Sequence, residues 1–324
     1  MILVTGGSGL LGSELINQLV NKGLKVRALV NSTPLKNFDV NKVESFKCNI
    51  LDVVTLEDAM VGITEIYHCA GLVSYEPGMY KQLYKINVEG TSNVVNAATS
   101  AQIKKFIHVS SVATLEKNEQ GLISEKMSFK EIDFKSNYAK SKYLGELEVW
   151  RSIAEGLNAI IVNPSIILGN GNWNEGSSTI FKSVYNEFPW YTNGKAGFVD
   201  VKDVAAAMII LMESDLSDER FILSGHNESF KNIFSLIAKG FNKKEPHKIA
   251  TPFMANIVWR LEYVRSKFSG KKPLVTKETA TSAFKISEYD NSKFLKNFPG
   301  FIYTPINDTL NFICASMQQK LNND

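Results

Sequence analysis

Short apolar segments rich in β-branched residues alternate with amphipathic segments through the first half of the chain. The apolar segments predict six strands, at residues 2–5, 26–30, 43–48, 65–70, 105–110 and 159–163. Between the first two, Leu11, Leu15 and Leu19 share one helical face and Gly23 follows, which is typical of an amphipathic helix with a glycine stop. Further helices are predicted at residues 55–61, 79–101 and 138–155. Strands and helices that alternate in this order predict a parallel sheet with helices on both faces.

The regular alternation ends near residue 164. Residues 169–178 are rich in Gly, Asn and Ser and predict a loop, after which one more helix and strand are predicted at 200–213 and 220–224. Helices without clear partner strands follow, including 252–268 and 304–321. We therefore expect an α/β fold, a Rossmann-type doubly wound parallel sheet with a smaller, partly interleaved C-terminal α+β domain. Residues 1–165 and about 199–225 form the first domain, and about 166–198 and 226–324 the second.

Composition narrows the class of protein. A chain of 324 residues suits one large α/β domain or two unequal ones. The formal net charge is only +3 and the basic residues are scattered, which excludes the electrostatic footprint of a nucleic-acid-binding protein. The three cysteines and four histidines show no metal-ligand spacing, so no metal is expected. A strand at residue 2 leaves no room for a signal peptide, and the longest apolar run, 204–212, is far shorter than a membrane span. We expect a cytoplasmic protein without membrane contact.

Three glycines lie three residues apart directly behind the first strand, in TGGSGLLG. A strand, a glycine turn and a helix N-terminus together form an anion site, because backbone N–H groups and the positive end of the helix dipole point at the ligand. The G-x-x-G-x-x-G spacing differs from the usual G-x-G-x-x-G of dinucleotide-binding turns. The pattern predicts a pyrophosphate site formed by Gly6, Gly9, Leu10, Leu11 and Gly12.

Two other strand ends support a dinucleotide. Cys69, Ala70 and Gly71 end the fourth strand with small residues, over which a cofactor can lie. Asn49 and Ile50 end the third strand, where a polar side chain and a backbone amide can reach an adenine ring. Because the carboxyl ends of parallel strands meet at one edge of the sheet, we expect all these groups along one ligand.

Tyr138 and Lys142 are four residues apart on a predicted helix and therefore share one face. A free tyrosine has a pKa near 10 and is a poor acid or base at neutral pH. A neighbouring ammonium favours the phenolate and brings the tyrosine toward its working range. The fifth strand ends in HVSS, which puts Ser110 or Ser111 at the same edge, where a hydroxyl can hold a substrate oxygen.

With these motifs in order, the chain resembles the extended short-chain dehydrogenases/reductases over essentially its whole length. The motifs are TGGSGLLG (5–12), HCAG (68–71), NVEGT (87–91), VSS (109–111), YAKSK (138–142), NPS (163–165) and FVDVKDVA (198–205). The resemblance implies NAD(P)-dependent chemistry, with Tyr138 as acid/base, Lys142 lowering its pKa and holding the nicotinamide ribose, and Ser111 binding the substrate oxygen.

The same resemblance implies further neighbours of the cofactor and a mode of assembly. Asn87 is expected near the cofactor, and Asn163 and Pro164 beside the nicotinamide carboxamide. Related proteins dimerise through the helices that match 79–101 and 138–155, so a homodimer is expected.

The end of the second strand bears on the choice between NAD(H) and NADP(H). Family members that require NAD often carry an acidic residue there, and those that prefer NADP often carry an Arg one residue later. Here these positions are Val30 and Asn31. The missing carboxylate removes repulsion against a 2′-phosphate and Lys36 is within reach of one, so we expect NADP(H) rather than NAD(H).

The NPS motif and residues 271–294 most resemble dihydroflavonol-reductase-like and 3β-hydroxysteroid-dehydrogenase-like members. This implies that the protein reduces a carbonyl, or oxidises a secondary alcohol, of a small apolar-leaning substrate. Candidate lining of the substrate pocket is Val73, Ser111 and, on the helix at 252–268, Trp259.

Two alternatives remain. A nucleotide-sugar epimerase or dehydratase with tightly bound NAD would use the same Tyr and Lys and would hold a diphosphate with arginines, for which Arg220, Arg260 and Arg265 are the candidates. Dehydration usually also requires an acidic pair beside the serine, where this chain has none. A non-catalytic cofactor-sensing protein is the minor alternative, and the presence of the Ser, Tyr and Lys argues against it.

Overall fold

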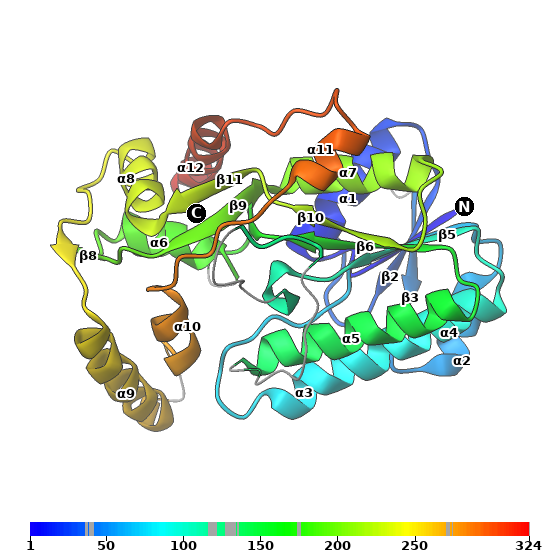
Figure 1. Cartoon of the computed structure of the whole chain (residues 1–324), viewed down its shortest axis with the longest axis horizontal. Helices are drawn as coiled ribbons and strands as arrows, with labels where there is room; N and C mark the ends of the chain where they lie inside the picture. Colours follow the sequence, from blue (N-terminus) through cyan, green and yellow to red (C-terminus); the bar gives the residue numbers. More distant parts are fainter. Residues whose placement is uncertain are drawn as a thin grey trace.

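The computed structural model describes residues 1–35, 38, 42–115, 122–126, 134, 136–173, 176–269, 273 and 275–323. A seven-stranded sheet in the order β10-β6-β5-β4-β1-β2-β3 runs through the molecule, and every neighbouring pair in it is parallel (Figure 1). Its strands are β1 (Ile2–Thr5), β2 (Val26–Val30), β3 (Val43–Lys47), β4 (Glu65–His68), β5 (Lys105–Val109), β6 (Ala159–Pro164) and β10 (Glu219–Leu223). The expected Rossmann-type sheet is confirmed.

Helices cover both faces of this sheet because successive strand residues point to opposite sides. Val4 faces a core with α1 (Leu10–Asn21) and α7 (Val201–Glu213). Its neighbour Leu3 faces the other core, beneath α2 (Val53–Met60), α4 (Gly90–Ser100) and α5 (Asn137–Ala154). Figure 1 shows the two layers on either side of the sheet.

The long helix expected at 79–101 is not α-helical throughout, because a π-helical turn divides it. It consists of α3 (Tyr80–Tyr84), a π-helical turn over Lys85–Glu89 and then α4. Such π turns are rare and are frequently found at functional sites. Here the turn carries Asn87, one of the residues implied by the family resemblance.

A second group of elements follows β6. A three-stranded sheet has the order β11-β9-β7, with β9 parallel to β7 and antiparallel to β11. A short parallel pair joins β12 to β8. These strands are β7 (Ile166–Leu168), β8 (Trp190–Tyr191), β9 (Lys195–Asp200), β11 (His226–Ser229) and β12 (Lys248–Ile249). The domain boundaries drawn from the sequence stay a prediction.

Three helices pack over the three-stranded sheet and form a core with it: α6 (Ser178–Tyr185), α8 (Phe230–Gly240) and α12 (Ile306–Asn323).

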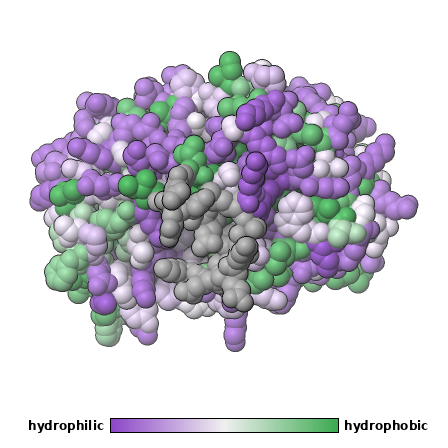
Figure 2. Space-filling model, in the orientation of Figure 1, coloured by the Kyte–Doolittle hydropathy of each residue, from purple (hydrophilic) through white to green (hydrophobic). Residues whose placement is uncertain are grey.

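The remaining elements are a short turn and three helices. A short 3₁₀ turn, Val112–Thr114, follows β5. The remaining helices are α9 (Pro252–Ser269), α10 (Lys277–Ser282) and α11 (Ser292–Asn297). In Figure 1, α9 lies at the outer edge of the molecule, and Figure 2 shows apolar side chains on the surface at that lower left corner. Within the described ranges, no helix combines the length and apolar content needed to cross a membrane.

One glycine fixes how closely α5 approaches the π turn. A Cβ placed on Gly145 would overlap the carbonyl oxygen of Asn87. Alanine is favoured over glycine by about 1 kcal/mol inside a helix, whereas overpacking of this kind costs about 1–3 kcal/mol. We expect Gly145→Ala to lower the free energy of unfolding by about 1–2 kcal/mol, measured by urea titration.

Leu147→Ala, at an exposed position of the same helix, is the control and should change stability by less than about 0.5 kcal/mol. A Gly145→Ala protein as stable as the wild type would show that separating the two backbones costs no more than the about 1 kcal/mol that alanine gains in a helix.

Candidate active site

The glycine turn after β1 packs closely against the segment that follows β4. Gly6 has φ +68°, a conformation that residues with a side chain rarely adopt. A Cβ at Gly6 would lie 2.6 Å from the backbone nitrogen of Ala70. The turn therefore needs glycine for its conformation and for its closeness to the neighbouring strand end.

The N-terminus of α1 opens at the same edge. Gly9 is the N-cap and makes no side-chain cap, while its N–H donates to the Gly6 carbonyl (3.0 Å). The first turn of α1 contains no acidic residue, and a Cβ at Gly12 would overlap the Gly6 oxygen. Because the first amides of a helix lack intrahelical partners, this end presents free N–H donors and a positive dipole. The residues fit the pyrophosphate of a dinucleotide.

A buried histidine that the sequence analysis did not single out holds these strand ends together. The Thr5 hydroxyl accepts from the N–H of Ala70 (3.1 Å) and lies 2.7 Å from Nδ1 of His68. Nε2 of His68 lies 3.0 Å from the hydroxyl of Thr91 on α4. Burial lowers the pKa of His68 to about 3, so the ring is neutral at physiological pH. The neutral imidazole bridges β1, β4 and α4 beneath residues 69–71.

The predicted Ser–Tyr pair is brought together. Tyr138 lies in the first turn of α5, whose N-cap Ser136 accepts from the N–H of Ala139 (3.2 Å). The side chain of Ser111 lies near enough to the Tyr138 phenol to lower its pKa. The Ser111 oxygen also accepts from the N–H of Ala113 (3.1 Å). The ring of Tyr75 meets that of Tyr138 edge-on, with centroids 5.5 Å apart.

The pKa of Tyr138 departs from the expectation drawn from the sequence. Burial raises it, because a phenolate would lose its hydration, and the hydrogen bond to Ser111 lowers it by less. The Lys142 ammonium, expected to lower it, donates instead to the carbonyl oxygen of Val109 (2.7 Å). In the protein without cofactor, Tyr138 is therefore a protonated phenol at neutral pH.

Lys142 is buried beside the end of β4. Burial lowers its pKa to about 8, although the negative charges of Glu146 and, when ionised, Cys69 act in the opposite direction. A Cβ on Gly71 would lie 3.6 Å from Nζ of Lys142 and 3.3 Å from Oδ1 of Asn87. Gly71 thus keeps open the space in which these two polar groups face the strand end.

The side chain of Asn87 is engaged within the protein. Its Oδ1 accepts from the N–H of Leu72 (2.7 Å), and its Nδ2 donates to the Leu72 carbonyl (2.9 Å) and the Ser141 hydroxyl (2.9 Å). The Ser141 hydroxyl donates in turn to the Tyr138 carbonyl (2.8 Å). Asn87 therefore ties the segment after β4 to the turn of α5 that carries the tyrosine.

A carboxylate that the sequence analysis missed lies behind these groups. Glu146 is buried one helical turn after Lys142 and accepts hydrogen bonds on both oxygens. Its donors are Ser110 Oγ (2.6 Å), Thr114 Oγ1 (3.1 Å) and Asn163 Nδ2 (3.0 Å) on one oxygen, and Trp150 Nε1 (3.3 Å) and Arg220 Nη1 (3.1 Å) on the other. The one signal in the sequence was its i,i+4 spacing from Lys142, which puts both on the same helix face.

Asn163, expected beside the nicotinamide, is part of this network. Its Nδ2 also donates to the backbone carbonyl of Ser111 (3.1 Å). The Asn163 side chain therefore holds the backbone carbonyl of Ser111 in place. Pro164 follows at the buried end of β6.

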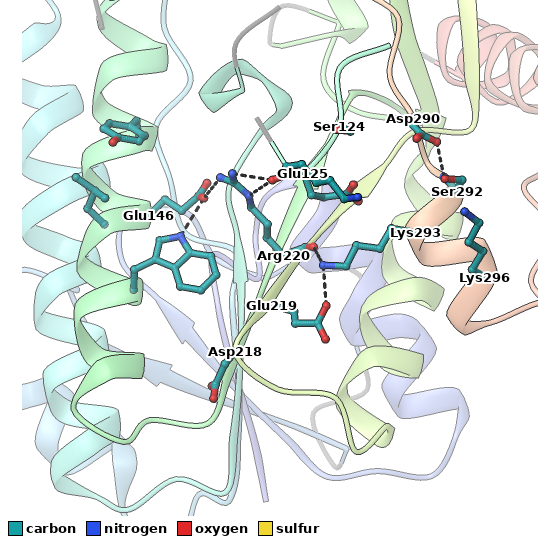
Figure 3. A pocket seen from close by; sticks show the side chains of 14 residues that line it. Ser124, Glu125, Glu146, Asp218, Glu219, Arg220, Asp290, Ser292, Lys293 and Lys296 are labelled. Carbon is teal, nitrogen blue, oxygen red and sulfur yellow. Dashed lines mark hydrogen bonds and ion pairs between the residues drawn. The ribbon is translucent and has the colours of Figure 1, made fainter. Parts of the chain in front are cut away.

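A cavity of about 790 Å³ lies on the other side of Glu146, between α5, β10 and α11 (Figure 3). In its wall, the Arg220 guanidinium bonds Glu146 and, through Nε and Nη2, the backbone carbonyl of Glu125 (3.1 and 2.8 Å). Lys293 pairs with Glu219 (2.7 Å). Arg220 supports the buried carboxylate, and it is not free to take the diphosphate for which it was a candidate.

The remaining residues predicted to bind the cofactor or the substrate lie on several other segments of the chain. Asn49 accepts from the N–H of Leu51 (3.1 Å), and the Ile50 carbonyl accepts from Asn93 (3.1 Å). Leu11 is buried in the core beneath α1, and Leu10 is partly buried beside it. Asn31 and Val73 are exposed, and Lys36 lies outside the described residues.

Trp259 lies on α9, and its Nε1 donates to Asn256 (2.9 Å). Its place in a substrate pocket stays a prediction. Among the residues that the structure describes, no group of three His, Cys, Asp or Glu side chains could hold a metal ion.

Comparisons with known proteins agree with this geometry. Residues 2–223 match the model of the NAD dependent epimerase/dehydratase family. The chain is 25% identical to cinnamoyl-CoA reductase 1 of Petunia hybrida, over 99% of this chain and 92% of the relative. It is 26% identical to a putative dihydroflavonol 4-reductase of Synechocystis, over 90% and 87%. Sterol demethylase protein B of Methylococcus capsulatus is 28% identical over 69% of this chain and 70% of its own.

Solved structures share the fold along the whole chain. The crystal structure of gox2253 superposes with a TM-score of 0.84 at 28% identity, covering 99% of this chain and 98% of that one. UDP-glucose 4-epimerase of Thermotoga maritima superposes with a TM-score of 0.79 at 18% identity, covering 99% of both. The chain belongs to the NAD dependent epimerase/dehydratase family, and it is an NAD(P)-dependent oxidoreductase of the extended short-chain dehydrogenase/reductase type.

Proposed function

We propose that the protein is an NADPH-dependent reductase of small, largely apolar aldehydes or ketones. The observation that carries this proposal is the placement of three side chains: Ser111 caps the turn after β5, Tyr138 lies beside it in the first turn of α5, and Lys142 follows one helical turn later, bound to the Val109 carbonyl. Carbonyl reduction needs a proton donor at the substrate oxygen, and the phenol of Tyr138 carries its proton over the whole physiological range.

Each residue of the site has one task in this reaction. Ser111 donates a hydrogen bond to the substrate carbonyl oxygen, and Tyr138 gives that oxygen its proton. Lys142, protonated below its pKa of about 8, stabilises the phenolate that is left. Bound NADPH supplies the hydride.

The preference for NADPH rests on the end of β2. Asn31 is exposed directly after Val30, so no carboxylate stands there to repel a 2′-phosphate or to bind the ribose hydroxyls. The curated relatives with reductase names are consistent with a dissociable reduced cofactor.

The hydrogen bonds that the arginines already make argue against the alternative function of a nucleotide-sugar epimerase. The chain has five, and each already bonds a neighbour: Arg27 with Glu44, Arg151 with Glu148 and Glu155, Arg220 with Glu146, Arg260 with the Asn256 carbonyl, and Arg265 with Glu262. Of the candidates for a diphosphate, Arg220 uses three of its nitrogens for Glu146 and the Glu125 carbonyl, so binding a diphosphate with it would require breaking these bonds. The homodimer through the helices of residues 80–100 and 137–154 remains part of this proposal.

We expect Tyr138→Phe to bind NADPH as the wild type does and to lose at least about a hundredfold in kcat, because only the proton donor is removed. The measurement is steady-state reduction of an aromatic aldehyde together with NADPH titration by fluorescence. Tyr75→Phe is the matched control, since it keeps the ring contact with Tyr138 and removes a hydroxyl outside the pair. A fully active Tyr138→Phe protein would refute the mechanism.

Reduction should depend on pH through Lys142. Both Tyr138 and Lys142 must be protonated, so kcat/KM is expected to be flat below neutrality and to fall as the pH rises through about 8, where the buried ammonium loses its proton. A profile that stays flat to pH 10 would contradict this.

In Glu146→Gln, the fall of kcat/KM with rising pH should occur at lower pH than in the wild type, because the negative charge that favours the Lys142 ammonium is gone. Stability should drop by about 1–3 kcal/mol, since the buried group loses its charge-assisted hydrogen bonds to Arg220 and the other donors. Glu148→Gln is the control on the same helix: its charge does not contribute to the pKa of Lys142, so the pH of the fall should stay unchanged.

Asn31→Asp should weaken NADPH binding about tenfold or more, because a carboxylate at the end of β2 repels the 2′-phosphate. NADH binding should hold or improve. Asn31→Gln is the neutral control. An equal loss in both variants would assign the effect to shape rather than charge.

A further inference from the structure

The outermost helix of the protein turns an apolar stripe toward solvent. In α9, Phe253, Ile257, Leu261, Val264 and Phe268 are all exposed, Phe253 by 73% and Phe268 by 89%. At about 100° per residue these five positions fall within an arc of about 80°. No residue of α9 is buried. Figure 1 shows the helix at the edge of the molecule and Figure 2 the apolar surface there.

The other face of α9 is sufficient to hold it in place. Trp259 and Tyr263 are half-buried on this inner face, and α9 packs against α10. The exposed stripe is therefore not needed for the fold of this part of the chain. Stripes of this size on a protein surface mark sites of interaction.

The charges of α9 are arranged around the stripe. Arg260 and Lys267 lie along one side of it and Arg265 along the other, by the same helical spacing. Glu262, the single acidic residue of the helix, is half-buried on the inner side and pairs with Arg265 (2.7 Å). Three basic residues against one acidic residue leave the helix with a charge of +2.

This charge pattern disfavours a second copy of the chain. Met254, Ile257, Leu261, Val264 and Phe268 have the spacing of a coiled-coil seam. In a pair of α9 helices, Arg260, Arg265 and Lys267 would occupy the flanking positions of both copies and face like charges. A peptide helix would need a groove, whereas the stripe lies on the outward side of the outermost helix.

We propose that the outer face of α9 binds the surface of an anionic lipid bilayer. A helix with a continuous apolar stripe and basic residues on both borders lies in the plane of the membrane interface, with its apolar side chains among the acyl chains. The basic side chains reach outward to the phosphate groups. The proposal departs from the absence of membrane contact expected from the sequence, because that expectation considered only segments long enough to span.

The surface lies one helix away from the catalytic tyrosine. On α10, which packs against α9, Glu278 accepts from the Ser136 hydroxyl (2.9 Å) and the Asn137 N–H (3.3 Å) at the start of α5. An apolar substrate dissolved in the bilayer would therefore be released near Tyr138. This last step alone rests on the proposed reductase function.

The test is flotation of the purified full chain with lipid vesicles. Vesicles of phosphatidylcholine with roughly a third phosphatidylserine should bind the protein at least about tenfold more tightly than phosphatidylcholine alone, and added salt should weaken the binding. The double variant Leu261→Glu with Phe268→Glu should lose at least about tenfold in binding. Ile302→Glu, at a position 85% exposed outside any helix, is the control and should bind as the wild type does.

Other outcomes would overturn the proposal. They are no binding to anionic vesicles, equal binding by the double variant, or a concentration-dependent dimer that only the double variant loses. Because vesicle binding is measured without substrate, its result is independent of the reductase assay. Both variants should keep the wild-type rate on a water-soluble aldehyde, which shows that they are folded.

Discussion

The buried carboxylate of Glu146 is the constraint on which the active site depends. Five donors converge on its two oxygens, from the residue after β5, the 3₁₀ turn, β6, β10 and α5. A buried carboxylate without such partners would be costly, and with them it fixes the relative positions of these elements. Ser111 caps the 3₁₀ turn and Tyr138 lies on α5, so the carboxylate links the two segments that carry them.

Burial acts in opposite directions on the two groups that handle protons. It raises the pKa of Tyr138 because the phenolate is disfavoured, and it lowers the pKa of Lys142 because the ammonium is disfavoured. Burial therefore places the pKa of Lys142, at about 8, below that of Tyr138. Tyr138 is thus protonated at neutral pH, and the guanidinium of Arg220 is taken up by Glu146 and the Glu125 carbonyl.

Local signals in the sequence were enough for the large sheet and the cofactor edge. The strands expected at 2–5 and 26–30 have those bounds in the structure, because each is a short β-branched run ended by glycine or polar residues. The glycine turn was recognisable because its conformation and its closeness to β4 require glycine at fixed positions. The pairing of Tyr138 with Lys142 on one face followed from helical spacing alone.

Contacts between distant parts of the chain decided the rest. The small sheet was missed because β9 pairs with β7 and β11, and its short strands show no clear alternation. Glu146 gave almost no signal because its partners Asn163 and Arg220 come from other strands. The pKa of Tyr138 depends on burial, which spacing does not contain. The sequence by itself determined the fold class and which side chains are candidates for the site, since both follow from local patterns. Only the tertiary structure decided the charge states of these side chains and the hydrogen bonds that support them, because desolvation and long-range hydrogen bonds exist only once the chain is folded.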